Sequence, residues 1–125
     1  MKLIFGGAYQ GKLEYALTTF GSELTSYKCD EHTVDFNHDA DILIDYHLLV
    51  LAQLRKDIDP CAYIDSHREA LRDKIILCDD ISCGVVPMKE ELRRWREAVG
   101  RCMGLLTKHA ERVDRVFCGL GRRLK

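Results

Sequence analysis

The stretch Gly6-Gly7-Ala8-Tyr9-Gln10-Gly11-Lys12-Leu13 decides which fold this chain can adopt. It follows the short apolar run Met1–Phe5 and precedes a segment with a helical pattern. A strand, a glycine-rich turn and a helix start form the setting that a phosphate-binding loop needs. The pattern G-x-x-x-x-G-K is satisfied, and in such loops backbone N–H groups and the lysine hold phosphate oxygens.

The loop departs from this pattern at its last position, where Leu13 replaces the Ser or Thr whose hydroxyl binds magnesium. Magnesium would then depend on phosphates, water and carboxylates, so nucleotide binding without catalysis is an alternative to catalysis. An ordinary glycine turn with an exposed Lys12 is a further alternative. We predict that ATP or GTP is bound by Gly6, Gly7, Ala8, Tyr9, Gln10, Gly11, Lys12 and Leu13.

The composition indicates a single globular domain over residues 1–125, with 46% hydrophobic and 31% charged residues. The formal net charge of −1 argues against nucleic acid as a partner. The charge is uneven, since Lys89–Lys125 carries 11 basic and 5 acidic residues. A solvated helix face is the simpler explanation for this basic part, and an anionic ligand is the alternative.

The sequence shows neither a signal peptide nor an apolar run of the ~20 residues that a membrane span needs. We therefore expect a cytoplasmic protein with no membrane partner. The six cysteines are scattered without a C-x-x-C pair, which predicts reduced thiols. Cys78 and Cys118 lie in strand-like runs, where we expect them to be buried like small hydrophobic residues.

Short apolar runs alternate with helical patterns along the chain. Strands are predicted at Lys2–Phe5, His32–Phe36, Asp41–Asp45, Lys74–Cys78 and Val113–Cys118, with an edge strand inside Gly119–Lys125. Helices are predicted at Gly11–Phe20, Tyr46–Leu54, Ala62–Arg72 and Met88–His109, with irregular chain over Gly21–Asp30 and a loop over Ile81–Pro87. This alternation predicts an α/β fold, a P-loop NTPase-like parallel sheet flanked by helices on both faces.

The longest predicted helix carries an apolar stripe, at Met88, Leu92, Trp95, Val99, Cys102, Met103 and Leu106. The stripe predicts a helix face that packs on the sheet. The same stripe would also suit a homo-oligomer interface.

Carboxylates follow two of the predicted strands, Asp45 after the first and Asp79 with Asp80 after the second. Parallel sheets place ligands at the carboxyl ends of their strands, so these groups are candidates for the site. We predict that Asp45 and Asp79 bind Mg²⁺, and that Lys12, Asp45 and Asp80 are catalytic. The simpler alternative is that these carboxylates only cap the following helix or loop.

Metal-ligand residue types also gather between Cys29 and Asp39, but their spacing matches no closed zinc pattern. Neither His38 nor His47 is marked as a nucleophile by its place in the sequence. We therefore predict no metal site in this segment.

Several of these motifs resemble the adenosylcobinamide kinase/adenosylcobinamide-phosphate guanylyltransferase family. The likeness covers the loop Gly6–Lys12 and the chain from about Asp41 to Lys125. Ile75–Pro87 is similar to that family's strand and loop ending in Gly-Ile-Val-Pro, and Cys118–Gly121 to its terminal Ser-Gly-Ile-Gly. Asp45 falls on the family's Walker-B-like Glu.

The resemblance implies a nucleotide-binding fold that uses ATP or GTP with Mg²⁺ to phosphorylate the hydroxyl of a cobinamide-type small molecule. It also implies an oligomer. Leu13 and Gln10 stand where the family has serines, and Met103 stands where it has Asn. The segment with the family's guanylylated histidine is missing before Asp41, so guanylyl transfer is not expected. A catalytically degenerate nucleotide-binding, regulatory or assembly module of the same fold is the alternative.

Overall fold

Among the residues that the structure describes, six strands form one sheet at the centre of the molecule. The computed structural model describes residues 1–82 and 88–125. The strands are β1 (Lys2–Gly6), β2 (Ser26–Lys28), β3 (Ile42–Ile44), β4 (Ile75–Asp79), β5 (Arg112–Phe117) and β6 (Leu120–Arg123). They lie in the order β2-β3-β4-β1-β5-β6, and all neighbours are parallel except β5 and β6, which form an antiparallel hairpin.

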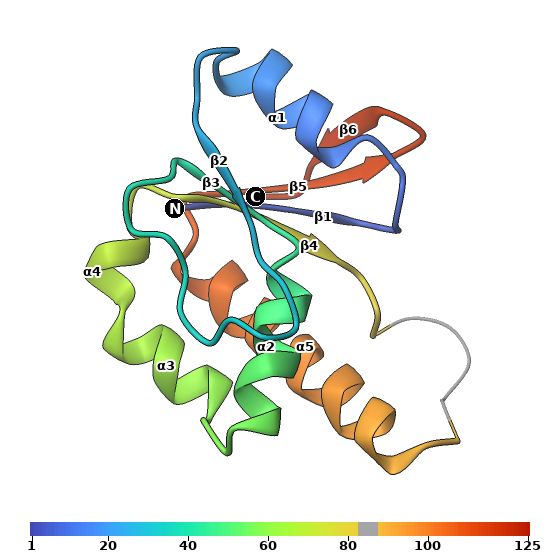
Figure 1. The fold of residues 1–125 in the computed structure, drawn as a ribbon. Coiled ribbons are helices and arrows are strands. Elements are labelled where there is room, and N and C mark those ends of the chain that lie inside the picture. Colours follow the sequence, from blue (N-terminus) through green and yellow to red (C-terminus); the bar gives the residue numbers. More distant parts are fainter. Residues whose placement is uncertain (83–87) are drawn as a thin grey trace.

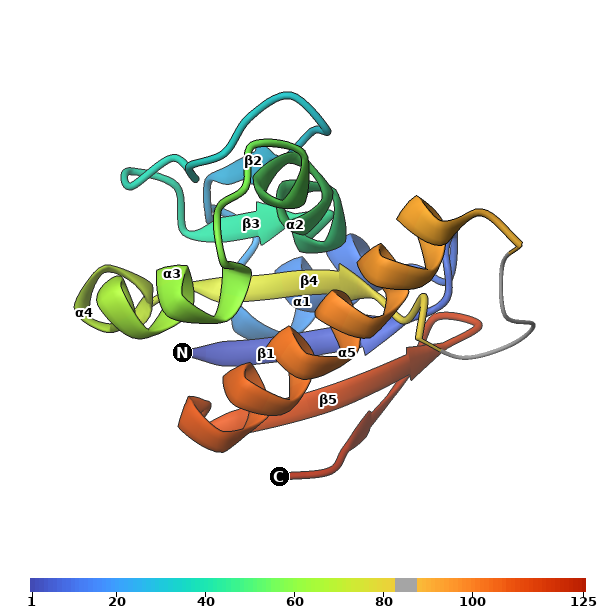
Figure 2. The ribbon, with the colours of Figure 1, turned by 90° about the horizontal axis from the view of Figure 1, so that it is seen from below.

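Helices cover both faces of this sheet. They are α1 (Lys12–Phe20), α2 (Tyr46–Arg55), α3 (Pro60–Ser66), α4 (Arg68–Leu71) and α5 (Glu90–His109). Figure 1 shows α1 on one face and α2, α3, α4 and α5 on the opposite face. Seen from below, α5 runs beneath β1 and β5 (Figure 2). The predicted α/β architecture, a largely parallel sheet with helices on both faces, is therefore confirmed.

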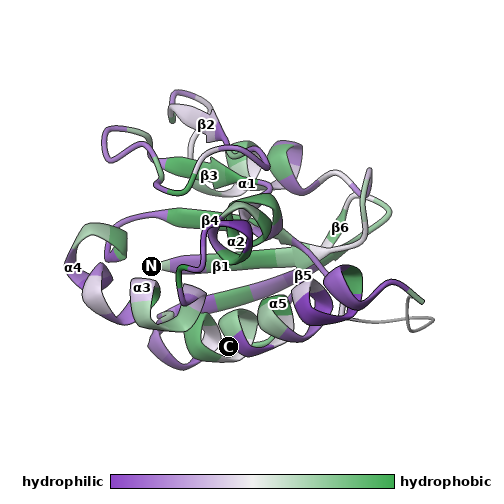
Figure 3. Cartoon of the chain, turned by 60° about the horizontal axis from the view of Figure 1, so that its bottom comes forward, coloured by the Kyte–Doolittle hydropathy of each residue, from purple (hydrophilic) through white to green (hydrophobic). Residues whose placement is uncertain are grey.

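Two apolar clusters hold these layers together. The smaller one joins α1 to the sheet and includes Ile4, Ala16, Leu77 and Val116. The larger one lies between the sheet and α2–α5. The strands β3 and β4 are largely hydrophobic, whereas β2 and many residues of the outer helices and loops are hydrophilic (Figure 3). A strand covered on both faces must be apolar on both, which explains the continuous runs in the sequence.

Two predictions about the segment before β3 are wrong. The chain over Gly21–Asp30 was predicted to be irregular, but it contains the polar edge strand β2. His32–Phe36 was predicted to be a strand, but it forms turns. Asp30 accepts hydrogen bonds from the His32 N–H at 2.8 Å and the Thr33 hydroxyl at 2.9 Å, and such local bonds compete with strand pairing.

The predicted helix Ala62–Arg72 is two helices, α3 and α4, separated at His67. The Asp59 carboxylate caps α3 by accepting from the N–H groups of Cys61 and Ala62. The last helix begins at Glu90 rather than Met88, and Met88 is exposed rather than part of the apolar stripe.

The prediction that the thiol is buried is confirmed for Cys78 and wrong for Cys118. Cys78 is buried in β4, whereas Cys118 is exposed at the tip of the β5–β6 hairpin with a positive φ of 51°. The cysteines of the described part of the chain carry free thiols. Within the same part, no helix is long and apolar enough to cross a bilayer. The predicted loop residues Gly84 and Pro87 lie outside the described residues.

Candidate functional site

An open cavity of about 460 Å³ lies at the carboxyl ends of β1, β3 and β4. β1 leads into α1 on one face of the sheet, whereas α5, the helix that follows the neighbouring strand β4 in the chain, lies on the other face. Where neighbouring strands send their connections to opposite faces, an open α/β sheet leaves a crevice in which ligands bind. The cavity is lined by Ala8, Tyr9, Gln10, Gly11, Lys12, Leu13, Glu14, Lys28, Ile44, Asp45, His47, Leu77 and Asp79.

The loop between β1 and α1 requires glycine at its first position. A Cβ on Gly6 would lie 2.3 Å from the carbonyl oxygen of Val116 in β5, so a larger residue would push the two strands apart. Gly11 has a φ of 87°, which is the left-handed region that favours glycine. The backbone geometry therefore requires glycine at two of the three positions of the sequence pattern, Gly6 and Gly11.

Gln10 ties this loop to the β5–β6 hairpin. Its side-chain oxygen accepts from the N–H of Cys118 at 2.6 Å, and its carbonyl oxygen accepts from the N–H of Gly119 at 2.8 Å. Backbone hydrogen bonds among the described residues use none of the N–H groups from Gly7 to Leu13. These donors lie at the N-terminus of α1, where the helix dipole favours an anion.

Lys12 folds back over the loop. Its side chain is 9% exposed, and its Nζ donates to the Gly7 carbonyl oxygen at 2.7 Å. The same ammonium lies 2.6 Å from Oδ1 of Asp79 at the end of β4. The lysine is therefore held inside the cavity, and the alternative of an ordinary turn with an exposed lysine is not supported.

Asp45 follows β3 and precedes α2 with a left-handed backbone, at a φ of 58°. This conformation is uncommon for residues other than glycine, although Asp tolerates it better than most. The Asp45 side chain does not cap α2 with a hydrogen bond, so the capping alternative fails for it. Its Oδ2 lies 3.8 Å from Nζ of the exposed Lys28 on β2.

His47 is the residue of this site that the sequence interpretation missed. It is buried in the first turn of α2, and one of its ring nitrogens lies with a carboxylate oxygen of Asp45 and of Asp79 within 4.8 Å of one another. Burial lowers the pKa of His47, and the Asp79 carboxylate opposes this effect. The available signal was the spacing Asp45-x-His47, which places the ring beside the strand end.

Leu13 and Asp80 lie apart from the polar centre of the cavity. Leu13 packs against the apolar cluster beneath α1. Asp80 is not among the described residues that line the cavity, and its Oδ1 accepts from the Ser82 hydroxyl at 2.7 Å. The structure thus brings together Lys12, Asp45 and Asp79 of the predicted site residues, and adds His47.

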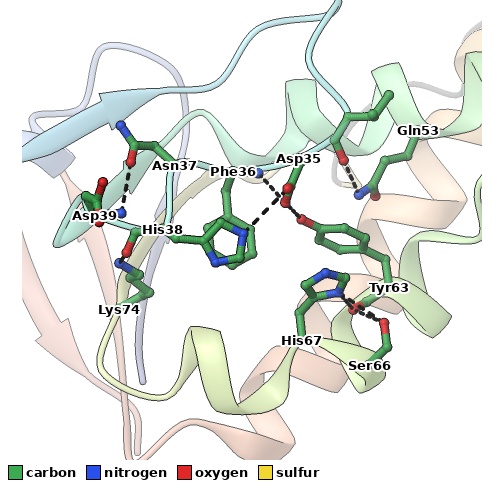
Figure 4. A network of polar contacts seen from close by, with 11 residues as sticks. Asp35, Phe36, Asn37, His38, Asp39, Gln53, Tyr63, Ser66, His67 and Lys74 are labelled. Atoms are coloured by element: carbon green, nitrogen blue, oxygen red, sulfur yellow. Dashed lines mark hydrogen bonds and ion pairs between the residues drawn. The ribbon is translucent and has the colours of Figure 1, made fainter.

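Asp35 links the segment between Cys29 and Asp39 to α3. The Asp35 carboxylate accepts from the Tyr63 hydroxyl, and His38 Nε2 lies 3.5 Å from the same carboxylate (Figure 4). His67 stacks on Tyr63 with ring centroids 4.0 Å apart. Burial raises the pKa of the Cys29 thiol to about 12. Among the described residues, the cluster of potential metal ligands is the one at Asp45, His47 and Asp79.

Comparison of the sequence with models of known protein families found no match, and comparison with curated proteins found none either.

Proposed function

We propose that this protein binds ATP or GTP with Mg²⁺ at the carboxyl edge of its sheet and transfers a phosphoryl group to the hydroxyl of a small molecule. The fold is proposed to be that of a P-loop NTPase, and the acceptor to be of the cobinamide type, as the sequence resemblance implies. The observation that carries this proposal is the buried ammonium of Lys12, folded over a glycine loop whose N–H groups have no described acceptor.

The loop supplies what a chain of phosphates requires. Free N–H groups and a helix N-terminus attract anionic oxygens, and a lysine adds a full positive charge. When phosphate enters, the Lys12 ammonium would exchange the Gly7 carbonyl for a phosphate oxygen. The phosphate oxyanions would then neutralise the Lys12 ammonium, which is neutralised by Asp79 in the ligand-free protein.

Asp45 and Asp79 are the carboxylates that would hold Mg²⁺, and a bound Mg²⁺ would neutralise charge on the phosphates. In the transfer, the acceptor oxygen forms a bond to the terminal phosphorus while the bond from phosphorus to the bridging oxygen breaks. The nucleoside diphosphate leaves, and the hydroxyl proton passes to a nearby base. Asp45, 23% exposed at the cavity wall, is the carboxylate that is not paired with Lys12; it lies 3.8 Å from the exposed Lys28 instead.

Leu13 supports a second candidate function, nucleotide binding without turnover. Its side chain packs into the apolar cluster and offers no oxygen to a cation. A protein of this kind would be a regulatory or assembly module that responds to nucleotide.

Calorimetric titration with ATP and GTP, with and without Mg²⁺, tests nucleotide binding. Lys12→Ala is expected to abolish the binding, whereas the control Lys56→Ala removes an exposed lysine at the far end of α2. Equal affinity in the Lys12→Ala variant and the native protein would refute the proposal.

Turnover separates the two candidates. Formation of nucleoside diphosphate that depends on adenosylcobinamide would establish the kinase. Tight nucleotide binding without turnover of any cobinamide would support the second candidate, a module that binds nucleotide without catalysis.

A further inference from the structure

Trp95 of α5 holds His47 in place through a hydrogen bond and a ring contact. The indole Nε1 donates to the His47 carbonyl oxygen at 2.7 Å, and the two rings stack with their centroids 6.0 Å apart. The His47 side chain is 8% exposed. The imidazole is therefore held at the edge of the cavity with little freedom to turn.

Both ring nitrogens of His47 face the same residue, Asp79. The backbone N–H of Asp79 donates to Nδ1 at 3.3 Å, and Nε2 lies 3.6 Å from Oδ2 of the Asp79 carboxylate. Because Nδ1 accepts a hydrogen bond, the single proton of the neutral ring belongs on Nε2, where it points to the carboxylate. One ring thus accepts a hydrogen bond from the main chain of Asp79 and faces its carboxylate.

This arrangement bears on whether His47 is a metal ligand. A histidine that ligates a metal through one nitrogen carries its proton on the other nitrogen and donates it to an acceptor. If Nε2 of His47 ligated a cation, the proton on Nδ1 would meet the N–H of Asp79, and two donors would face each other. The ligand cluster therefore reduces to the oxygens of Asp45 and Asp79.

We propose that His47 is a positioning residue that orients the Asp79 carboxylate, with one oxygen toward Lys12 and the cation site made of carboxylate oxygens alone. The inference rests on the proposed function for its consequences in nucleotide binding. The orientation of the Asp79 carboxylate is inferred from the contacts of His47 alone. Oxygen ligands without nitrogen suit Mg²⁺ or Mn²⁺ rather than Zn²⁺.

Two substitutions separate positioning from packing. His47→Phe keeps a ring against Trp95 but removes both nitrogens, whereas His47→Gln keeps an amide donor for Asp79 and loses the ring. We expect His47→Phe to weaken the affinity for Mg²⁺·ATP about tenfold and to leave the affinity for Mg²⁺-free ATP within about twofold. His47→Gln is expected to restore most of the loss. The control His67→Phe replaces the histidine stacked on Tyr63 and should change neither affinity.

A purely structural role for His47 predicts the opposite order, with His47→Phe close to the native protein and His47→Gln impaired. That order would overturn the proposal. So would an equal loss in both variants with no dependence on Mg²⁺.

A measurement on the ligand-free protein decides the geometry even if no nucleotide binds. Nitrogen NMR of the His47 ring should show the proton on Nε2. The ring should keep this tautomer when Mg²⁺ or Zn²⁺ is added. A proton on Nδ1, or direct coordination of Zn²⁺ by the ring, would refute the positioning role. Failure of nucleotide binding with the expected NMR result would instead refute the proposed function and leave His47 as the residue that orients Asp79.

Discussion

Lys12 and Asp79 neutralise each other across the carboxyl ends of β1 and β4, with Nζ and Oδ1 2.6 Å apart. The lysine is the group expected to bind phosphate, and the carboxylate is one of two groups expected to bind the cation. In the ligand-free protein the two groups are paired with each other, so neither is available to a ligand. The side chain of Lys12 is only 9% exposed and that of Asp79 is 17% exposed. Phosphate and cation together can separate this pair without leaving either charge uncompensated, so their binding should be coupled.

Asp79→Asn tests this coupling. The substitution releases the Lys12 ammonium from its carboxylate and removes a cation ligand. We expect ATP affinity without Mg²⁺ to be unchanged or higher, and the increase that Mg²⁺ brings in the native protein to be lost. Unfolding free energy should fall by about 1–3 kcal/mol, because a mostly buried charge-assisted hydrogen bond is weakened. Calorimetric titration and denaturant unfolding measure the two effects.

Asp80→Asn is the matched control, one residue further along the chain. Asp80 was predicted from the sequence to be catalytic, but its carboxylate accepts from Ser82 and does not line the described part of the cavity. Mg²⁺-dependent ATP binding should therefore survive Asp80→Asn. Loss of that binding in Asp80→Asn, with Asp79→Asn unaffected, would reverse the assignment of the two carboxylates.

Leu13→Ser restores the hydroxyl that the loop pattern normally carries. We expect Mg²⁺-dependent nucleotide affinity to rise, because a hydroxyl oxygen at the start of α1 becomes available to the cation. The cost is about 1 kcal/mol of unfolding free energy, since the partly buried leucine leaves its apolar cluster. Leu13→Ala carries the same packing loss without the oxygen, so a gain shared by both variants would show that the hydroxyl is not its cause.

The strands and the loop could be predicted because their causes are local. A strand covered by helices on both faces must be continuously apolar, and β3, β4 and the middle of β1 show this directly in the sequence. The edge strand β2 could not be recognised, because its residues Ser26–Lys28 are polar and its pairing with β3 depends on a partner distant in sequence. Cys118 was misplaced because β5 ends at Phe117, one residue before the end of the apolar run, so that Cys118 begins the turn to β6.

The site was predictable at its strand ends and not beyond them. Lys12, Asp45 and Asp79 follow from motif and strand position, and the topology brings them together. His47 gave no comparable signal, because its role depends on the ring orientation that Trp95 imposes from a helix 48 residues away. Sequence spacing also could not distinguish Asp79 from Asp80, whose side chains leave the end of β4 in different directions.

Gly6→Ala tests whether the close approach of β1 and β5 is essential. An added Cβ would lie 2.3 Å from the Val116 carbonyl oxygen, and backbone in the middle of a sheet cannot move aside cheaply. We expect a loss of about 3 kcal/mol in unfolding free energy. The control is Gly7→Ala, where the nearest atom is the flexible Cγ of Gln10 at an ordinary 3.5 Å. Thermal unfolding of both variants gives the comparison, and equal stability would show that the two strands can separate at this point.

Acid should destabilise the protein through carboxylates that accept local hydrogen bonds. The backbone N–H and the hydroxyl of Thr25 donate to Asp41 at 2.9 and 3.0 Å, and these bonds lower the pKa of Asp41 in the folded protein. A carboxyl whose folded pKa is depressed stabilises the fold above its unfolded pKa of about 3.9. That contribution is lost as the pH falls through the lower folded value, because the unfolded chain then binds the proton first.

Asp41→Asn should therefore reduce the steepness with which unfolding free energy falls below about pH 4. It should also lower the stability at pH 7, where the native carboxylate accepts both bonds from Thr25. The control Asp39→Asn removes an exposed carboxylate to which no described residue donates a hydrogen bond. Urea unfolding between pH 3 and pH 7 gives the slopes, and an Asp41→Asn slope as steep as that of the native protein would mean that other carboxylates carry the acid sensitivity.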